Sequence, residues 1–552
     1  MPRARFRPRF QISSRFLILS ASLYFGLALN CALWRYVLNK LTFSSFSECS
    51  LAIVLPLLVC IPLYLAFNLL ITPKTAKPLL IALLLISSTT NYLMTNLGVY
   101  IDRDMLRNAF ETNTREALDL VTWSGCLWVF FTGVLPAVAL LFTRVEFDSF
   151  KTECKKRLTG MLIALLTVGI IGAMSYKTLS AVGRNNKAAR KIINTQNYIY
   201  STFRYVQHKI NSRRPFVPLD EHAQITPYED HTKTVLIFVL GETARAANFS
   251  LQGYERQTNP LLKKQNIAYF KNVTSCGTAT AVSVPCLFSP VPRADFDVDD
   301  APYTENLIDL LQKAGYDILW RDNDDGCKGV CQRVRNEEMK NSRHPKYCFG
   351  SYCHDEVLLD GLEDIIKNIK QDTVIFLHTM GSHGPTYFNR YPDKFKKFNP
   401  TCDTADMQKC TKEQIVNTYD NTILYTDFIV SSAIDILKKF PQYEAGLIYV
   451  SDHGESLGEN NIYLHGFPYA LAPKEQIEVP MLVWMNSTMK KWDYIDFSCL
   501  KKEAEARSFS HDNIFHSLVG LLEIDTKEYD KRLDMFNPCR KKKLPFMERD
   551  EK

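Results

Sequence analysis

The sequence predicts an α/β soluble domain, with an open central sheet flanked by helices, attached to an all-α membrane domain of five helices. Two observations lead to this prediction. Five apolar runs of about 20 residues occupy the first third of the chain, and each is long enough to cross a bilayer. After residue 230, short apolar runs alternate with helical patterns, as in layered α/β domains. The chain of 552 residues is also too long for one ordinary domain.

The predicted boundaries divide the chain into three parts. We expect a membrane domain at 1–180, an amphipathic connector and linker at 181–230, and a soluble domain at 231–552. The apolar runs are 16–38, 51–71, 79–100, 120–142 and 158–179. Buried core helices are the alternative, but five successive runs with short connectors favour membrane spans. The first run is too long for a cleaved signal peptide, and no small-residue cleavage site follows it.

Basic residues around these runs predict the orientation of the membrane domain. Five arginines precede the first run, and lysines and arginines fill the connectors after the second and fourth runs. Such segments stay in the cytoplasm, so five spans would put the soluble domain outside. Much of the net charge of +7 comes from the basic residues in these segments. It therefore indicates membrane topology rather than nucleic-acid binding.

Ten of the 15 cysteines lie in the predicted soluble domain, and their spacing indicates disulfides. We expect five bridges between successive cysteines: Cys276–Cys286, Cys327–Cys331, Cys348–Cys353, Cys402–Cys410 and Cys499–Cys539. The second and third pairs could instead form a zinc site. Disulfides predict an oxidising compartment, which agrees with the topology.

The connector starts with a basic juxtamembrane stretch and continues with aromatic and apolar residues from Lys187 to Tyr205. This pattern is typical of a helix that lies on a membrane surface. A helix packed on the soluble domain is an equally good interpretation. Pro215, Pro218 and Pro227 then mark a linker.

The soluble part reads as buried strands alternating with helices. We expect strands at 234–240, 316–320, 373–377, 446–450 and 480–484, and helices at 306–314, 356–370, 423–439 and 511–522. Open sheets of this kind bind ligands beyond the carboxyl ends of their strands. Glu242, His383, Asp452 and His453 lie at or beyond such ends.

Glu242, Asp452 and His453 are the candidate metal ligands. Two carboxylates and one imidazole suit zinc, whose fourth position then takes a reactive group. A threonine in the loop between Cys276 and Cys286 could fill it, since a metal-bound hydroxyl becomes a nucleophile. Thr278 and Thr280 both lie in this loop. We expect Gly454 to let the backbone turn sharply where the ligands converge.

Three further residues have a functional and a structural interpretation. His383 and His465 could bind a second metal, bind a phosphate oxygen or donate a proton, but a structural histidine is the simpler interpretation for each taken singly. Lys328 could meet an anionic head group or be a solvated lysine. We expect His378 to be structural.

Four motifs give the chain a clear resemblance to the lipid A phosphoethanolamine transferases, inner-membrane enzymes of Gram-negative bacteria that include the colistin-resistance proteins. They are Gly241-Glu242-Thr243-Ala244-Arg245, the loop 275–286, the stretch 378–385 and Ser451-Asp452-His453-Gly454-Glu455-Ser456. The resemblance implies an alkaline phosphatase and sulfatase fold for the soluble domain. It implies Thr280 as nucleophile and Glu242, Thr280, Asp452 and His453 as zinc ligands. It also implies a second metal or substrate site at His383 and His465, with Lys328 near the phosphoethanolamine group.

The resemblance further implies a reaction in two halves. Thr280 takes phosphoethanolamine from phosphatidylethanolamine, and diacylglycerol leaves after protonation by His465 or His383. A phosphate of lipid A then takes the group, which lowers susceptibility to polymyxins and other cationic peptides. We expect membrane lipids as partners, no nucleic acid, and a monomer. The alternatives are a core-oligosaccharide acceptor, a glycerophosphate transferase, a sulfatase, and a membrane-anchored binding protein whose metal is structural.

Overall fold

The computed structural model describes residues 10–40, 46–111, 114–185, 192–211, 214–226, 232–350, 352–492, 494–542 and 546. Contacts divide the chain into two compact units. The first comprises Met1–Leu106 and Val121–Gln207, and the second comprises Arg107–Leu120 and His208–Lys552. This division differs from the predicted boundaries, because a segment inside the predicted membrane domain groups with the second unit.

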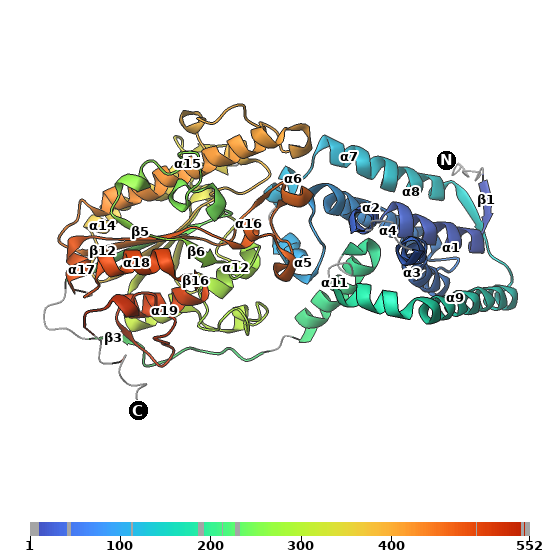
Figure 1. The fold of residues 1–552 in the computed structure, drawn as a ribbon, viewed down its shortest axis with the longest axis horizontal. Helices are drawn as coiled ribbons and strands as arrows, with labels where there is room; N and C mark the ends of the chain where they lie inside the picture. Colours follow the sequence, from blue (N-terminus) through green and yellow to red (C-terminus); the bar gives the residue numbers. More distant parts are fainter. Residues whose placement is uncertain are drawn as a thin grey trace, which may run out of the picture. The chain divides into compact units, whose positions relative to one another are not determined.

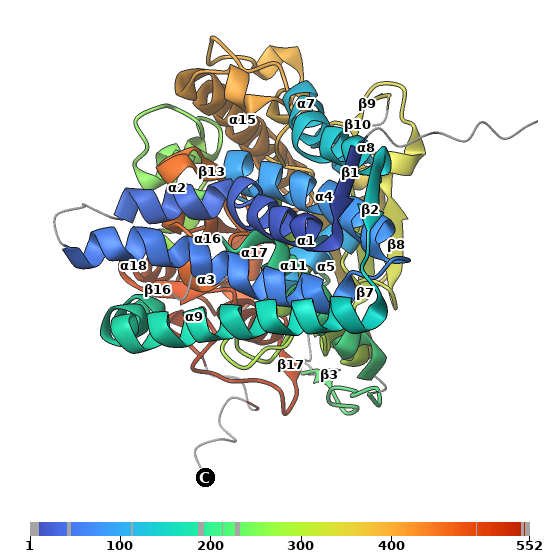
Figure 2. The same ribbon diagram turned by 90° about the vertical axis from the view of Figure 1, so that its right-hand side faces the viewer.

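The first unit is helical (Figure 2), and most of each predicted apolar run lies in its helices. Its elements are β1 (Phe10–Ser13), α1 (Ser14–Leu23), η1 (Tyr24–Ala28), α2 (Cys31–Lys40), α3 (Phe46–Leu70), α4 (Ala76–Tyr92), η2 (Leu93–Leu97), α7 (Trp123–Val129), η3 (Phe130–Val134), α8 (Leu135–Leu141), β2 (Thr143–Glu146), α9 (Phe150–Asn185) and α11 (Asn194–Asn211). Helices α3 and α9 lie side by side. Many of their apolar side chains are exposed, as a lipid environment requires.

Within the described residues, two helices are long and apolar enough to cross a membrane: Ala76–Leu97 and Trp123–Leu141. The first predicted run is broken instead, because Ser14–Ala28 and Cys31–Leu38 meet at a bend of 53°. Counting this pair as one span gives up to three. Asn30 lies at the break, where its side chain donates to the Phe25 carbonyl oxygen. The predicted number of five spans is therefore not confirmed by length and composition.

Helix α11 (Asn194–Asn211) lies in the middle of the predicted connector. Its first residue, Asn194, donates its backbone N–H to Asn30 Oδ1 (2.8 Å) and its side-chain amide to the Ser87 carbonyl oxygen (2.8 Å). Tyr200 and Phe203 are exposed. The start of α11 is thus held by residues of the first unit, and the membrane-surface interpretation of the connector stays a prediction. The predicted features at Lys187 and Pro227, and Arg3 to Arg9 at the N-terminus, lie outside the described residues.

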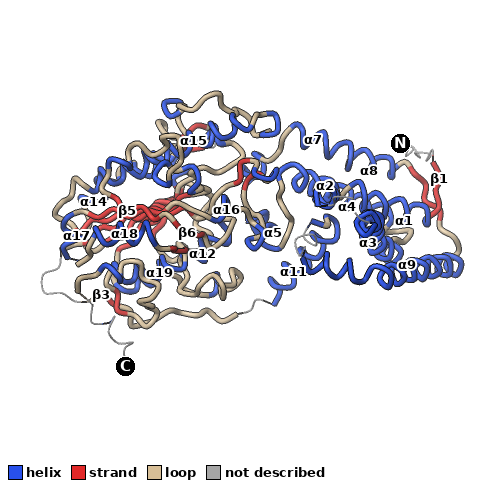
Figure 3. Tube along the Cα trace, viewed as in Figure 1, coloured by secondary structure: helices blue, strands red, loops and turns tan. Residues whose placement is uncertain are grey.

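A central sheet organises the second unit (Figure 3). Its strands are β4 (Thr234–Gly241), β5 (Ile267–Phe270), β7 (Asp317–Asp322), β8 (Arg335–Glu338), β11 (Thr373–His378), β12 (Glu444–Ser451) and β15 (Met481–Met485). Among the described residues their order is β5-β15-β12-β4-β11-β7-β8. Strand β15 runs in the opposite direction to the other six strands. In the register, His378 pairs with Leu240 and with Asp322. The carboxyl ends of β12, β4, β11 and β7 therefore meet at one edge.

Helices cover both faces of this sheet, as expected (Figure 1). Helices α14 (Leu362–Lys367) and α15 (Lys412–Leu437) lie on one side, and α18 (Phe497–Ala506) and α19 (Asp512–Leu521) on the other. Residues of α12 (Thr280–Leu287) and α13 (Leu307–Ala314) belong to the same core cluster as those of α18 and α19. Strands β4, β11 and β12 are buried throughout. Their continuous apolar runs, rather than alternation, are the signature of a sheet covered on both faces.

The five predicted strands and the predicted alkaline phosphatase and sulfatase type of fold are confirmed, but two strands of the central sheet were missed. β8 has the sequence Arg-Asn-Glu-Glu and only partial burial, as charged edge strands do. β5 is a short edge strand of four residues. The predicted helix 356–370 divides into a 3-10 turn at Asp355–Leu359 and α14. Gly361 separates them with a φ of +66°.

All five predicted disulfides are present: Cys276–Cys286, Cys327–Cys331, Cys348–Cys353, Cys402–Cys410 and Cys499–Cys539. Each joins a cysteine to the next one along the chain. The zinc-site alternative for the second and third pairs is excluded, since their thiols are used in the bridges.

The segment Arg107–Leu120 attaches to the second unit through Asp119 at the end of α6 (Thr114–Asp119). Asp119 accepts hydrogen bonds from the Tyr352 hydroxyl and from Thr386 Oγ1 (3.0 Å). The guanidinium of Arg390 lies 3.6 Å from the same carboxylate. These contacts explain why the segment groups with the α/β fold and not with the helices that precede and follow it.

Candidate active site

Glu242 follows β4 and is completely buried. The next residue, Thr243, has a φ of +52°, which is rare for a β-branched side chain. Its backbone N–H donates to Asp452 Oδ1 (3.1 Å), so the bond ties the end of β4 to the end of β12. Strain of this kind persists where surrounding contacts impose it, and it clusters at functional sites.

Asp452 and His453 follow β12 and are also completely buried. His453 Nδ1 lies 2.9 Å from the Gly454 carbonyl oxygen. Because a carbonyl oxygen only accepts, Nδ1 carries the proton, and Nε2 of the neutral ring presents a lone pair. Burial lowers the pKa of the His453 imidazole below its ordinary value, which favours this neutral form.

The lone pair of His453 Nε2 faces two carboxylate oxygens. Asp452 Oδ2 lies at 3.3 Å and Glu242 Oε1 at 3.6 Å. Ligands about 2.1 Å from a tetrahedral zinc ion are separated by about 3.4 Å. Asp452 Oδ2 is buried without a hydrogen-bond partner. The donor set Glu242, Asp452 and His453 therefore fits a divalent cation, and these ligand atoms all lie within 4.8 Å of one another.

Thr280 is the first residue of α12, and its hydroxyl faces the same cluster. Thr280 Oγ1 lies 3.1 Å from Glu242 Oε2 and 3.4 Å from His453 Nε2. The N-terminus of a helix stabilises negative charge on a hydroxyl oxygen or a bound phosphate. Thr278, the other candidate, instead donates to the Phe467 carbonyl oxygen (2.6 Å). Its hydroxyl is used in that bond, so the geometry favours Thr280.

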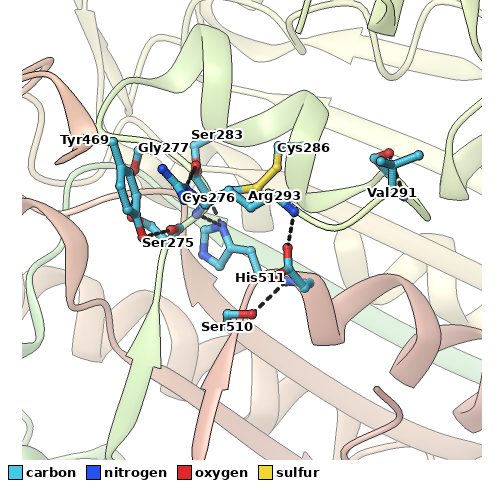
Figure 4. The surroundings of a disulfide bond; sticks show 12 residues. Ser275, Cys276, Gly277, Ser283, Cys286, Val291, Arg293, Tyr469, Ser510 and His511 are labelled. Carbon is cyan, nitrogen blue, oxygen red and sulfur yellow. Dashed lines mark hydrogen bonds between the residues drawn. A yellow bond between two sulfur atoms is a disulfide. The ribbon is translucent and has the colours of Figure 1, made fainter. Parts of the chain in front are cut away.

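Figure 4 shows how the loop that carries Thr280 is held around the Cys276–Cys286 disulfide. His511 Nε2 donates to the Ser451 carbonyl oxygen (3.0 Å), and Nδ1 accepts from the Cys276 N–H (3.1 Å). Burial lowers the pKa of His511 to about 4, so the ring is neutral at ordinary pH. Ser283 donates to the Asp452 carbonyl oxygen. The disulfide loop and the end of β12 are thus joined through shared partners.

The reason for glycine at position 454 differs from the expectation. Gly454 is not among the residues with a positive φ. A Cβ there would collide with the Glu475 carbonyl oxygen, so the position needs space rather than an unusual turn. Gly381 needs both, since its φ is +51° and a Cβ would press on the Glu242 backbone.

His465 and His383 lie beside the cluster. The rings of His453 and His465 are 4.6 Å apart between centroids, and those of His383 and His465 are 5.3 Å apart. His465 Nδ1 is 2.8 Å from Glu455 Oε2. Burial alone would lower the pKa of His465, but the Glu455 carboxylate raises it above the ordinary value. Burial, with His465 and Arg390 nearby, lowers the pKa of His383 well below its usual range.

Lys328 lines a cavity of about 490 Å³ beside the loop that carries Thr280. Pro285 of α12, Asn306 and Gly329 also line it. Lys328 has a φ of +49°, and its ammonium donates to the Asp325 carbonyl oxygen (3.0 Å). Its charge also acts on His383 and Asp324, as expected for a residue near the carboxyl edge of the sheet.

Sequence reasoning missed a second group of buried polar residues on the other side of Glu242. His378, expected to be structural, ends β11 between Glu242 and the acidic turn that follows β7. Asp322 at the end of β7 and Asp324 of that turn are both buried. The run Asp322-Asn323-Asp324-Asp325 at the end of a strand was the signal that could have found them.

Comparison with known proteins defines the class. Residues 234–524 match the sulfatase family, and residues 58–210 match the family described as phosphoethanolamine transferase EptA/EptB. The phosphoethanolamine transferase EptA of Escherichia coli K12 is 40% identical over 532 residues, which cover 95% of this chain and 96% of that protein. The phosphatidylethanolamine transferase Mcr-1 of Escherichia coli is 37% identical, covering 83% and 85%.

A solved structure agrees along the whole chain. The integral membrane lipooligosaccharide phosphoethanolamine transferase A from Neisseria meningitidis superposes with a TM-score of 0.94 at 36% identity, covering 97% of this chain and 100% of that one. The fold and the site thus define an enzyme of the alkaline phosphatase and sulfatase class. More narrowly, the chain belongs to the EptA/EptB family of phosphoethanolamine transferases. It is a multi-pass protein of the bacterial inner membrane, with its catalytic domain in the periplasm.

Proposed function

We propose that the protein is a zinc-dependent enzyme that moves phosphoethanolamine from phosphatidylethanolamine to a phosphate of lipid A, through a covalent intermediate on Thr280. One observation carries this proposal: Thr280 Oγ1 lies between Glu242 Oε2 and His453 Nε2 at the start of α12. The names of two relatives support the two substrates, since one names phosphatidylethanolamine and the other lipooligosaccharide.

Glu242, Asp452 and His453 would hold the zinc ion, and the Thr280 oxygen would complete a tetrahedral set. When bound, zinc lowers the pKa of the threonine hydroxyl and offsets charge on phosphoryl oxygens. His453 keeps its lone pair available through the bond from Nδ1 to Gly454. The helix N-terminus adds a favourable field where the phosphoryl group would lie.

In the first half-reaction, Thr280 Oγ1 forms a bond to the phosphorus of phosphatidylethanolamine, after its proton has passed to solvent. The bond from phosphorus to the diacylglycerol oxygen breaks, and that oxygen takes a proton. His465 is the proposed donor, because its bond to Glu455 through Nδ1 leaves Nε2 to carry the transferable proton. His383 and Lys328 would contact the phosphoryl oxygens.

In the second half-reaction, an oxygen of a lipid A phosphate forms a bond to the same phosphorus, and Thr280 Oγ1 leaves and takes a proton back from solvent. His465 regains its proton from solvent. Both substrates are lipids, so a membrane-anchored monomer keeps the site and the phosphates close together and raises their effective concentration. The added ammonium weakens the attraction of cationic peptides to lipid A.

Intact mass spectrometry of the full chain in detergent tests the covalent step. After exposure to phosphatidylethanolamine, the wild type and Thr278→Ala should carry one phosphoethanolamine, and Thr280→Ala should carry none. An adduct on Thr280→Ala would overturn the assignment of the nucleophile. Turnover by Thr280→Ala should fall by about 10³-fold or more.

The acceptor needs a separate experiment in cells. Lipid A from cells expressing the gene should gain phosphoethanolamine, and the polymyxin concentration needed to stop growth should rise. Modification of the core oligosaccharide alone would point to the other acceptor. The relatives named Kdo(2)-lipid A phosphoethanolamine 7''-transferase are only 26% identical, which does not favour that alternative.

A further inference from the structure

A second group of buried donors lies at the carboxyl edge of the sheet, away from Thr280. Glu242, Asp324 and His378 each offer one ligand atom, and these atoms all lie within 4.8 Å of one another. The sheet order explains the cluster, because β11 lies between β4 and β7. His378 therefore stands between Glu242, which follows β4, and Asp324, which follows β7.

The ring of His378 is oriented as a metal ligand would be. Nδ1 lies 3.0 Å from Asp322 Oδ2, so Nδ1 donates and Nε2 is turned to the other side of the ring. Trp320 Nε1 donates to the same carboxylate oxygen (2.9 Å) and fixes it. A histidine that donates one nitrogen to a carboxylate and offers the other is the common arrangement around bound metals.

Two buried atoms of these side chains have no hydrogen-bond partner within the described structure. They are His378 Nε2, which faces the Asp324 carboxylate, and Asp324 Oδ1, and both side chains are at least 97% buried. His378 Nε2 lies 3.7 Å from Asp324 Oδ2, which is too long for a hydrogen bond. It is close to the separation of about 3.4 Å between two ligands of one tetrahedral ion. Buried polar atoms without partners are costly, and a cation between them would remove that cost.

We propose that Glu242, Asp324 and His378 form a second divalent-cation site, and that Glu242 links it to the site formed with Asp452 and His453. The inference rests on the metal-binding role of Glu242 in the proposed function. Two carboxylates and an imidazole suit zinc or manganese. Paired metal sites that share a carboxylate are common in enzymes that act on phosphate esters, where both ions contact the reacting group.

The second site differs from the one expected at His383 and His465. Among the described residues, neither of those histidines falls in a group of three possible ligands that satisfies the same distances. His465 instead bonds to Glu455. The new site uses residues on β11 and after β7 that the family motifs did not single out as ligands.

Metal analysis of the full chain in detergent tests the inference. After equilibration with Zn²⁺ and removal of loose metal, the wild type should hold two equivalents of zinc. Asp324→Asn and His378→Gln should each hold one. Asp325→Asn is the matched control, because its neighbouring carboxylate pairs with Lys340 (3.2 Å), and it should hold two.

A second set of variants separates this inference from the proposed function. Asp452→Asn should also hold one equivalent, and Asp452→Asn combined with Asp324→Asn should hold none. If Asp324→Asn loses one equivalent while Asp452→Asn loses none, the second site stands and the first fails. Zinc content unchanged in Asp324→Asn and His378→Gln would overturn the inference. A proton on His378 Nε2, shared with Asp324, would then explain the cluster.

Thermal unfolding tests whether a variant loses zinc because a ligand is missing or because the protein is misfolded. Added Zn²⁺ should raise the Tm of metal-depleted wild type more than that of Asp324→Asn, because a ligand bound only to the folded state stabilises it in proportion to its occupancy. Asp324→Asn keeps the size of the side chain. An equal rise in Tm for wild type and Asp324→Asn would contradict the second site even if His378→Gln failed to fold.

Discussion

The two sides of β4 carry similar donors in different surroundings. On the β12 side, His453 gives its Nδ1 proton to a backbone carbonyl, and Thr280 presents a hydroxyl at a helix N-terminus. On the β11 side, His378 gives its Nδ1 proton to a carboxylate, Asp322. A carboxylate partner makes an imidazole more basic than a carbonyl partner does.

The comparison suggests that the β12 side of this sheet edge carries the reacting group, and that the β11 side supplies further charged side chains around Glu242. The β12 side combines two carboxylates, a neutral imidazole and the proposed nucleophile, Thr280. The β11 side has a greater density of negative charge, since Asp322 and Asp324 both lie beside His378. Burial raises the pKa of Asp324 to about 6. Glu242 belongs to both sides, so substitutions can test each alone or both together.

Replacing Glu242 should have the largest effect, because it removes a donor from both sides. We expect Glu242→Gln to lose both zinc equivalents and at least about 10³-fold in turnover of labelled phosphatidylethanolamine. Glu444→Gln is a matched control at the start of β12. Burial raises the pKa of Glu444 to about 8, so glutamine resembles its protonated form at pH 7. If Glu242→Gln kept either activity or metal, the comparison would fail.

Next in size is the contrast between Asp452→Asn and Asp324→Asn. Asp452 lies on the side that holds Thr280, so its loss should lower kcat by about 10²-fold more than the loss of Asp324. Kinetics on the two variants, each with its zinc content measured, would check the ratio. Equal losses would mean that the two sides contribute equally to the chemistry.

Removing a disulfide should have a smaller effect on kcat, and the effect should differ between a disulfide beside the site and one far from it. Cys276→Ser with Cys286→Ser should lower kcat about tenfold, because the loop that carries Thr280 loosens. Cys499→Ser with Cys539→Ser should leave kcat nearly unchanged. It should cost about 1 kcal/mol more unfolding free energy, because the loop it closes spans 40 residues rather than 10. The reverse pattern in kcat would contradict the role given to the first bridge.

The smallest expected effect is a loss of stability in acid. His511 has a pKa of about 4 when folded and about 6.5 when unfolded. Its depressed pKa therefore has little effect on stability above about pH 7.5 and lowers stability as the pH falls through 6.5 toward 4, because the unfolded chain binds the proton first. We expect this residue to lower the unfolding free energy by about 0.8 kcal/mol between pH 7.5 and pH 6.

Chemical denaturation at both pH values would measure this change. His511→Gln should flatten the pH dependence, whereas the exposed His222→Gln should not. A His511→Gln protein with the full pH dependence of the wild type would show that another group carries the effect.

Much of the fold could be predicted because its signals are local. Runs such as 234–240 and 446–450 are apolar on both faces, and the residues that follow them belong at the carboxyl edge of the sheet. The pairing of cysteines also followed from spacing alone. Strand β8 could not be predicted, since Arg-Asn-Glu-Glu joins the sheet only through its neighbour β7.

The role of His378 could not be predicted for a different reason. Alternation along one strand shows which way a side chain points but not which strands lie beside it. The order β4-β11-β7 depends on long-range crossovers, and only this order brings Glu242 and Asp324 to either side of His378. The assignment of Arg107–Leu120 to the second unit is equally long-range, since it depends on contacts with Tyr352, Thr386 and Arg390.

The pairing of each cysteine with the next one has a consequence for biogenesis. A chain exported from its N-terminal side delivers its cysteines to the periplasm in sequence order. A dithiol oxidase that joins thiols as they emerge would then make Cys276–Cys286, Cys327–Cys331, Cys348–Cys353, Cys402–Cys410 and Cys499–Cys539 directly. Maturation should therefore require an oxidase but no disulfide isomerase, because no bridge has to wait for a cysteine beyond the next.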